Sequence, residues 1–223
     1  MSNISKDTFQ FLEELKENNN RDWFTANKAR YEAAKAEFET FVDALISRIS
    51  EFDPSIAHHT AKECVFRIYR DVRFSADKSP YKTHMGAHIT SAAKKSEIHS
   101  KAGYYIHLCP GETMLAGGAY QPQGPWLKAI RQEIHYHLDE WQAILNNQDF
   151  ITYFGTIEGE KLQKAPKDYP ADHPALEWLK HKSFLATHYP NDAKVLDRHF
   201  LNHCASVFQA LFPFDRFLNR AMD

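Results

Sequence analysis

The sequence has no long apolar run, few cysteines and little net charge. None of its 223 residues lie in a stretch approaching the roughly 20 apolar residues that cross a bilayer, so we expect no membrane partner. The three cysteines are far apart and form no C-x-x-C pair, which argues against a disulfide framework and a thiolate zinc site. The N-terminal residues show no basic segment followed by an apolar run, and we therefore expect a cytoplasmic protein.

Motifs that would name a chemistry are also missing. The chain contains no G-x-S-x-G elbow, no G-x-x-x-x-G-K-[ST] loop, no G-x-G-x-x-G and no H-E-x-x-H. Its 13 histidines offer no third ligand at a recognisable spacing, so we predict neither a metal site nor a cofactor. Whether the protein is an enzyme stays open at this point, and no catalytic residue can be assigned.

Apolar residues at intervals of three and four predict helices toward both ends of the chain. The predicted helices span about 8–17, 23–50, 124–145, 172–180 and 192–211, and Pro213 is expected to end the last one. Residues 150–173 contain two glycines and two prolines and are expected to form a hairpin or loop.

The period changes between about residues 64 and 120. The runs 85–90, 103–108 and 113–120 are short, rich in β-formers and separated by polar or turn-forming residues, as is typical of strands. We therefore predict an α+β fold: a single domain, residues 1–223, with a mainly antiparallel sheet at about 64–120, covered by long amphipathic helices from both chain ends.

One segment of the sheet region is unusually basic. The stretch FRIYRDVRFSADKSPYKTH, residues 66–84, holds five Arg or Lys and two Asp, a net charge of +3 in a chain whose net charge is −2. Residues 66–74 satisfy both strand and helix spacing, and we favour a strand that ends in an irregular turn near 70–77. Because its apolar residues suggest the core, we expect the cations to be buried and to require negative partners.

The same segment carries a resemblance. Residues 67–81, R-I-Y-R-D-V-R-F-S-A-D-K-S-P-Y, resemble the signature of DUF2461, a family of uncharacterised function with an Arg, then R-D-x-R-F, then D-K and a Tyr. N-N-R-D-W-F at 19–24 and K-x-P-K-x-Y at 164–169 followed by D-H-P at 172–174 also fit. The resemblance spans about residues 5–210 and implies a single soluble domain without assigning any catalytic residue.

Arginine presents a planar fork that matches carboxylate and phosphate oxygens, and arginines three residues apart converge where the chain turns. We therefore predict that the segment binds a small phosphate- or carboxylate-bearing ligand in an Arg/Lys-rich pocket. The predicted ligand-binding residues are Arg67, Arg70, Asp71, Arg73, Asp77, Lys78, Tyr81 and Lys82.

Three other interpretations stay open. The cations can form an ion-pair network that ties the sheet to its helices without any ligand. The protein can be an enzyme acting on an anionic ligand, with metal-dependent hydrolysis as the least unlikely reaction, although the segment offers only two acids for a metal. Basic and aromatic residues together can also bind nucleic acid, but a pI near 6.7 disfavours an extended polyanion.

Overall fold

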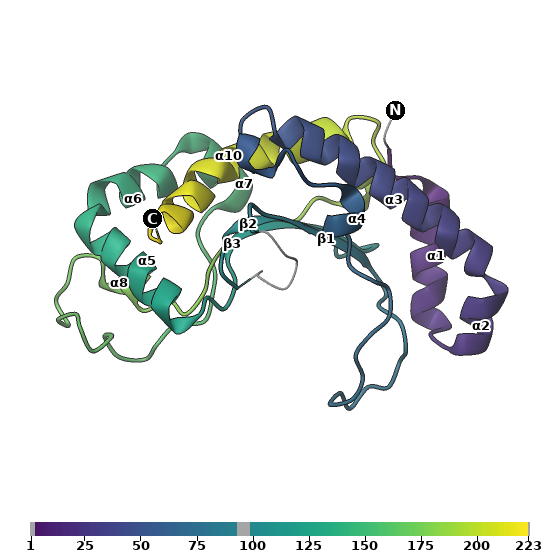
Figure 1. Ribbon diagram of the computed structural model, residues 1–223, viewed down its shortest axis with the longest axis horizontal. Helices are drawn as coiled ribbons and strands as arrows, with labels where there is room; N and C mark the ends of the chain where they lie inside the picture. The colour runs from purple at the N-terminus through teal and green to yellow at the C-terminus, as the bar shows by residue number, and fades with distance from the viewer. Residues whose placement is uncertain (1–2, 93–98, 223) are drawn as a thin grey trace. The chain divides into compact units, whose positions relative to one another are not determined.

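A computed structural model describes residues 3–92 and 99–222 of the chain. The strands form one antiparallel sheet in the order β1-β2-β3-β4, which confirms the predicted α+β class (Figure 1). The strands are β1 (Met85–Ile89), β2 (Gly103–Leu108), β3 (Met114–Ala119) and β4 (Phe184–His188). The helices are α1 (Lys6–Glu17), α2 (Arg21–Ala26), α3 (Lys28–Ile49), η1 (Pro54–Ile56), α4 (Ala61–Cys64), α5 (Gly124–Tyr136), α6 (Leu138–Leu145), α7 (Gln148–Phe154), α8 (Leu176–Leu179), α9 (Asp192–Val195) and α10 (Phe200–Arg220).

The chain divides into two compact units. The first consists of Met1–Ile89, Tyr105–Leu115 and Tyr189–Ser206, and the second of Thr90–Tyr104, Ala116–His188 and Val207–Asp223. The single domain inferred from the sequence therefore stays a prediction. No described helix combines the length and the apolarity that crossing a bilayer requires.

In the first unit, α1 and α3 bury one apolar face each. The Ser5 hydroxyl accepts a hydrogen bond from the Thr8 backbone N–H at 3.2 Å, and this cap starts α1 close to the predicted residue. The predicted single helix over 23–50 is wrong, because α2 ends at Ala26 and α3 begins at Lys28. Asn27 lies at the break, where its side-chain amide donates to the Trp23 carbonyl at 3.0 Å and competes with helix continuation.

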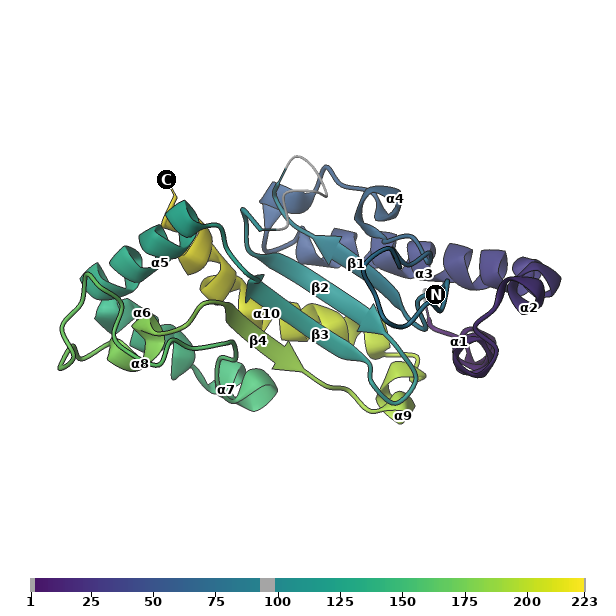
Figure 2. The ribbon, with the colours of Figure 1, turned by 90° about the horizontal axis from the view of Figure 1, so that it is seen from below.

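Strands β1, β2 and β3 lie within the predicted runs and alternate as expected. In β2 the side chains of Tyr104, Ile106 and Leu108 are buried, whereas Tyr105 and His107 are only partly covered. Figure 2 shows β1 and β2 from the side opposite α3, which packs against β1. Helix α3 therefore does not cover this second face of β1 and β2.

In the second unit the sequence missed one strand and misplaced one helix end. Strand β4 was not predicted, because its residues, FLATH, do not alternate cleanly between buried and less buried positions and lie between two predicted helices. Helix α10 continues to Arg220 through Pro213, contrary to the predicted stop. Phe214, Phe217 and Leu218 are almost completely buried, and their burial outweighs the backbone hydrogen bond that the proline removes.

The remaining helices of the second unit differ from prediction at their boundaries. The predicted helix over 124–145 consists of α5 and α6, which meet at His137. Helix α7 occupies the beginning of the expected loop over 150–173, and single bridges pair Glu158 with Leu185 and Lys161 with His181 in its later part.

Candidate functional site

Residues 66–84 form a long two-armed projection, which we call the basic hairpin. Single antiparallel bridges join Val65 to Ala87 and Tyr69 to Tyr81, and the Lys82 N–H donates to the Ile68 carbonyl at 2.7 Å. Between these bridges the arms are extended but make no regular ladder. The segment is thus neither a full strand nor a helix, and it leads into an irregular turn as we favoured.

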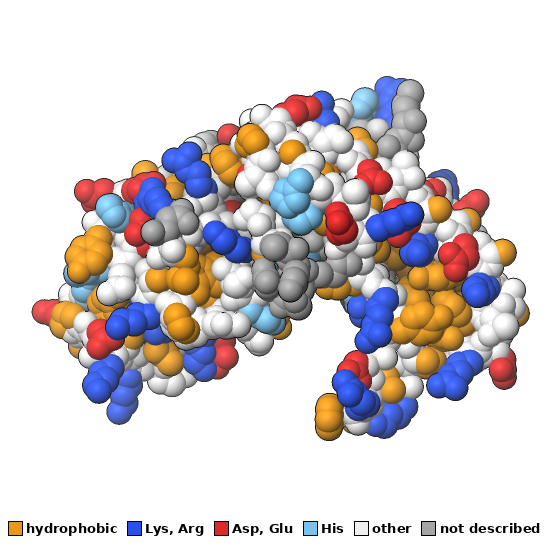
Figure 3. Space-filling view, viewed as in Figure 1, with side chains coloured by type: hydrophobic (Ala, Val, Ile, Leu, Met, Phe, Trp, Pro, Cys, Tyr) orange, Lys and Arg blue, Asp and Glu red, His pale blue; other side chains and the backbone are white. Residues whose placement is uncertain are grey.

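The basic hairpin lies at the surface rather than in the core. Phe74, near the tip, is 97% exposed, and the side chain of Arg73 is 77% exposed. Figure 3 shows Lys and Arg side chains gathered over the projecting hairpin. The expectation that these cations are buried is wrong, because the hairpin projects from the body of the unit; Ile68 and Tyr81 stay buried near its base, whereas Arg73 and Phe74 near the tip are exposed.

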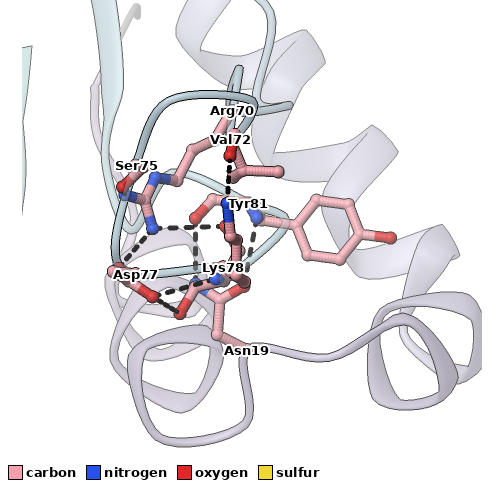
Figure 4. Close-up of polar contacts among 8 residues, drawn as sticks. Asn19, Arg70, Val72, Ser75, Asp77, Lys78 and Tyr81 are labelled. Atoms are coloured by element: carbon pink, nitrogen blue, oxygen red, sulfur yellow. Dashed lines mark hydrogen bonds and ion pairs between the residues drawn. The ribbon is translucent and has the colours of Figure 1, made fainter.

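Arg70 fastens the tip of the hairpin (Figure 4). Its guanidinium pairs with Asp77 and also donates to the Ser79 carbonyl at 3.2 Å. Asp77 in turn accepts hydrogen bonds from the Ser79 N–H at 2.9 Å and the Ser79 hydroxyl at 2.6 Å. The bonds from Ser79, and then that from Arg70, lower the pKa of Asp77 to about 2, so this carboxylate is ionised at neutral pH.

The second acid of the hairpin is also paired. Arg73 holds Asp71 with two N–H groups at 2.9 and 2.6 Å, and these bonds lower the pKa of Asp71 to about 2. The Lys78 ammonium donates to the neutral Val72 carbonyl at 2.9 Å. Within the described ranges, no carboxylate lies in ion-pair distance of Arg67 or Lys78, so the positive charge of the hairpin exceeds what its own acids neutralise.

Tyr81 anchors the hairpin to the helices instead of lining a pocket rim. Its ring is buried and stacks on Phe24 of α2 with the ring centroids 3.9 Å apart. The Asn19 side chain accepts from the Tyr81 N–H at 3.1 Å and donates to the Tyr81 carbonyl at 2.9 Å. This double hydrogen bond fixes the arm that carries Lys82.

A cluster of partly buried side chains lies where the hairpin meets the sheet. We call Lys82, His84, Tyr105 and His107 the base cluster. The rings of His84 and His107 lie 4.0 Å apart between centroids, and the Tyr105 hydroxyl is hydrogen-bonded to His107 Nδ1 at 3.1 Å. Lys82 Nζ lies 5.3 Å from the centroid of the Phe66 ring, which in turn contacts Tyr105.

The surroundings of the base cluster keep its two imidazoles and its phenol uncharged. Burial, followed by the neighbouring His107 and the Lys82 charge, lowers the pKa of His84 to about 4. Burial also lowers the pKa of His107 and raises that of Tyr105 to about 12. At neutral pH the cluster therefore presents one ammonium, one phenol hydroxyl and two uncharged imidazoles.

Sequence reasoning did not bring these residues together. The sequence predicts no role for His84, Tyr105 or His107, although the period of two in β2 places Tyr105 and His107 on one face. In the described part of the chain, no three His, Cys, Asp or Glu side chains lie close enough to hold a metal ion. The cluster can bind an anion through donors, and its imidazoles can accept a proton.

The family described as "Conserved hypothetical protein (DUF2461)" matches residues 7–217, which include the basic hairpin and the base cluster. The chain belongs to this family. No curated protein and no solved structure gave a match. DUF2461 membership confirms the resemblance carried by residues 67–81 and assigns no ligand, so function has to be argued from the geometry.

Proposed function

We propose that the protein binds a small phosphate- or carboxylate-bearing ligand at the base of the basic hairpin. The observation that carries the proposal is the base cluster: the Lys82 ammonium beside His84, His107 and the Tyr105 hydroxyl, on a sheet face that α3 does not cover. An oxyanion placed there gains one charge-assisted bond and hydrogen bonds from neutral donors. No acid of the hairpin competes from within the cluster, because Asp71 and Asp77 are held by Arg73 and Arg70.

The other ligand-binding residues predicted from the sequence act on this site from a distance, by shaping the hairpin or by adding positive charge. Arg70, Asp77 and Lys78 shape the tip, and Tyr81 fixes the arm. Arg67 and Lys78, which have no described acid partner, add positive potential that attracts an anion to the hairpin. The hypothesis drawn from the sequence, an Arg/Lys-rich pocket, is thereby changed to a partly buried cluster at the base of the hairpin.

A thermal-shift screen with phosphorylated and carboxylated metabolites tests the proposal. A ligand at about 100 times its dissociation constant stabilises the protein by about 2.7 kcal/mol, which raises the melting temperature by about 5–10 °C for a chain of this size. Lys82→Gln removes a charged donor and should weaken binding about tenfold or more. Lys194→Gln, an exposed lysine on α9 of the same unit, makes the same charge change and should leave binding intact.

Three outcomes would count against the proposal. If no metabolite of either class stabilises the protein, the hairpin is better explained as a self-contained ion-pair network. If Lys82→Gln and Lys194→Gln weaken binding equally, only net charge matters. If generic oligonucleotides bind tightly at low salt, and their affinity falls steeply as the salt concentration rises, the hairpin is better explained as a nucleic-acid-binding element.

A second function, an enzyme acting on this ligand, is favoured by the neutral imidazoles. A histidine that is uncharged at neutral pH and lies beside a bound anionic substrate can act as a general base. His107→Gln should then abolish turnover of the ligand found in the screen while binding persists. If the unchanged protein does not turn the ligand over, the enzymatic interpretation is removed and the binding function stands. Turnover that survives His107→Gln would exclude His107 as the general base.

A further inference from the structure

Arg131 of α5 is a half-buried cation in the second unit, outside the site described above. Its Nε donates to the Leu179 carbonyl at 2.8 Å and its Nη2 to the His181 carbonyl at 3.1 Å, beside the end of α8. Burial lowers the pKa of this guanidinium, and no carboxylate of the described residues forms an ion pair with it. Backbone carbonyls thus hold the side chain in place while its charge stays unneutralised.

His135 follows Arg131 by one helical turn and therefore lies on the same face of α5. Its Nδ1 lies 2.7 Å from His173 Nε2, and the Ala175 backbone N–H donates to His173 Nδ1 at 3.0 Å. Because a backbone N–H can only donate, His173 Nδ1 carries no proton, and in the neutral ring the proton lies on Nε2. His173 then donates to His135 Nδ1, which leaves the proton of neutral His135 on its other nitrogen, Nε2.

Tyr169 completes the arrangement. Its ring packs edge-on against His135 and His173, with centroids 5.8 and 5.6 Å apart. Burial raises the pKa of the Tyr169 hydroxyl, whereas the charge of Arg131 acts in the opposite direction, so the hydroxyl is protonated near the guanidinium. Asp168, an exposed neighbour, is the acid whose charge acts on Arg131, and it is not within ion-pair distance.

We propose that Arg131, His135 and Tyr169 form a second anion site, which takes the carboxylate or phosphate group of a small ligand. Each of the three brings a donor for which the described residues provide no acid: a guanidinium N–H, an imidazole N–H and a phenol O–H. An oxyanion needs such donors and gains from the unneutralised charge. This site is independent of the base cluster, because all of its residues belong to the second unit.

Inorganic phosphate and acetate, titrated separately at constant ionic strength, are suitable probes. Saturable shifts of the His135 imidazole ¹⁵N resonances with either anion, and none with added chloride, are expected. His135→Gln and Tyr169→Phe should each weaken binding about tenfold, since each removes one donor to a charged group. His137→Gln, an exposed histidine at the junction of α5 and α6, is the matched control and should bind as the unchanged protein does.

Arg131→Met should abolish the shifts, and circular dichroism establishes whether that variant still folds. Arg131 is the donor to the Leu179 and His181 carbonyls, so this variant can lose its fold; if it does, the two milder variants carry the test. An absence of saturable shifts, or equal affinity in His135→Gln and His137→Gln, would overturn the proposal. Loss of the shifts in Lys82→Gln would also overturn it, because binding would then belong to the base cluster.

Discussion

Removing the Asn19 side chain tests how the basic hairpin is held. Asn19→Ala deletes two hydrogen bonds to the backbone of Tyr81, at 3.1 and 2.9 Å. Each such bond contributes about 0.5–1.5 kcal/mol, and because Tyr81 is buried its freed groups are poorly solvated, so we expect a loss of about 2 kcal/mol. The stacking of Tyr81 on Phe24 remains, and the arm should loosen without leaving the helices.

Amide hydrogen exchange at Tyr81 measures this loss directly. A local opening that is easier by about 2 kcal/mol speeds exchange about thirtyfold, and if the whole unit unfolds with it the melting temperature falls by about 4–8 °C. Asn18→Ala is the matched control, because among the described residues the Asn18 side chain bonds only to the Glu14 carbonyl of α1. Unchanged exchange at Tyr81 in Asn19→Ala, or an equal increase in Asn18→Ala, would refute the reasoning.

Three further predictions concern strain, protons and the hairpin tip. Gly118→Ala should lower the free energy of unfolding in urea by more than about 3 kcal/mol, because a Cβ there would lie 2.0 Å from the Phe184 carbonyl oxygen. Gly155→Ala, also at positive φ but with open space around it, should lower it by about 1 kcal/mol. Similar losses in the two variants would contradict this prediction. The pKa of His84 is about 4 in the folded chain, against an ordinary value of 6.5. Between pH 6.5 and pH 4 the unfolded chain therefore binds a proton at His84 that the folded chain does not, so stability is lost as the pH falls through this range. His84→Gln should reduce the fall in melting temperature between pH 7 and 4.5, His137→Gln should not, and equal falls would count against the assignment. Asp77→Asn removes the ion-pair partner of Arg70 and should speed tryptic cleavage after the exposed Arg73. Asp139→Asn changes an exposed acid in the first turn of α6 and should leave the cleavage rate unchanged. Cleavage at the original rate in Asp77→Asn would show that the Arg70–Asp77 ion pair does not hold the tip of the hairpin.

The fold class followed from local patterns because β1, β2, β3 and most of the longer helices have recognisable periods. Tyr104, Ile106 and Leu108 alternate with polar or less buried neighbours, which is sufficient to predict β2 and its buried face. The errors come from tertiary contacts that a local pattern does not contain. Helix α10 passes Pro213 because its last turns are buried, and α2 separates from α3 at Asn27 because a side chain caps a backbone carbonyl.

The candidate site was located in sequence but assigned the wrong environment. Apolar residues between the arginines suggested the core, yet Phe74 projects from the tip of the hairpin, because alternation alone does not distinguish a sheet strand from an extended arm. Pairing of Asp71 with Arg73 is a contact two residues apart and was within reach of sequence reasoning. The meeting of His84 with His107 was not, because it depends on the register of β1 against β2.

The imidazole resonances of His84 and His107 give the most direct test of the central claim, that the base cluster binds an oxyanion ligand. In ¹H–¹⁵N spectra at neutral pH, titration with the metabolite that stabilises the protein should shift both histidines saturably. These shifts should be lost in Lys82→Gln and kept in Lys194→Gln. A ligand that saturates the protein without moving either resonance, or that moves them equally in both variants, would contradict the account.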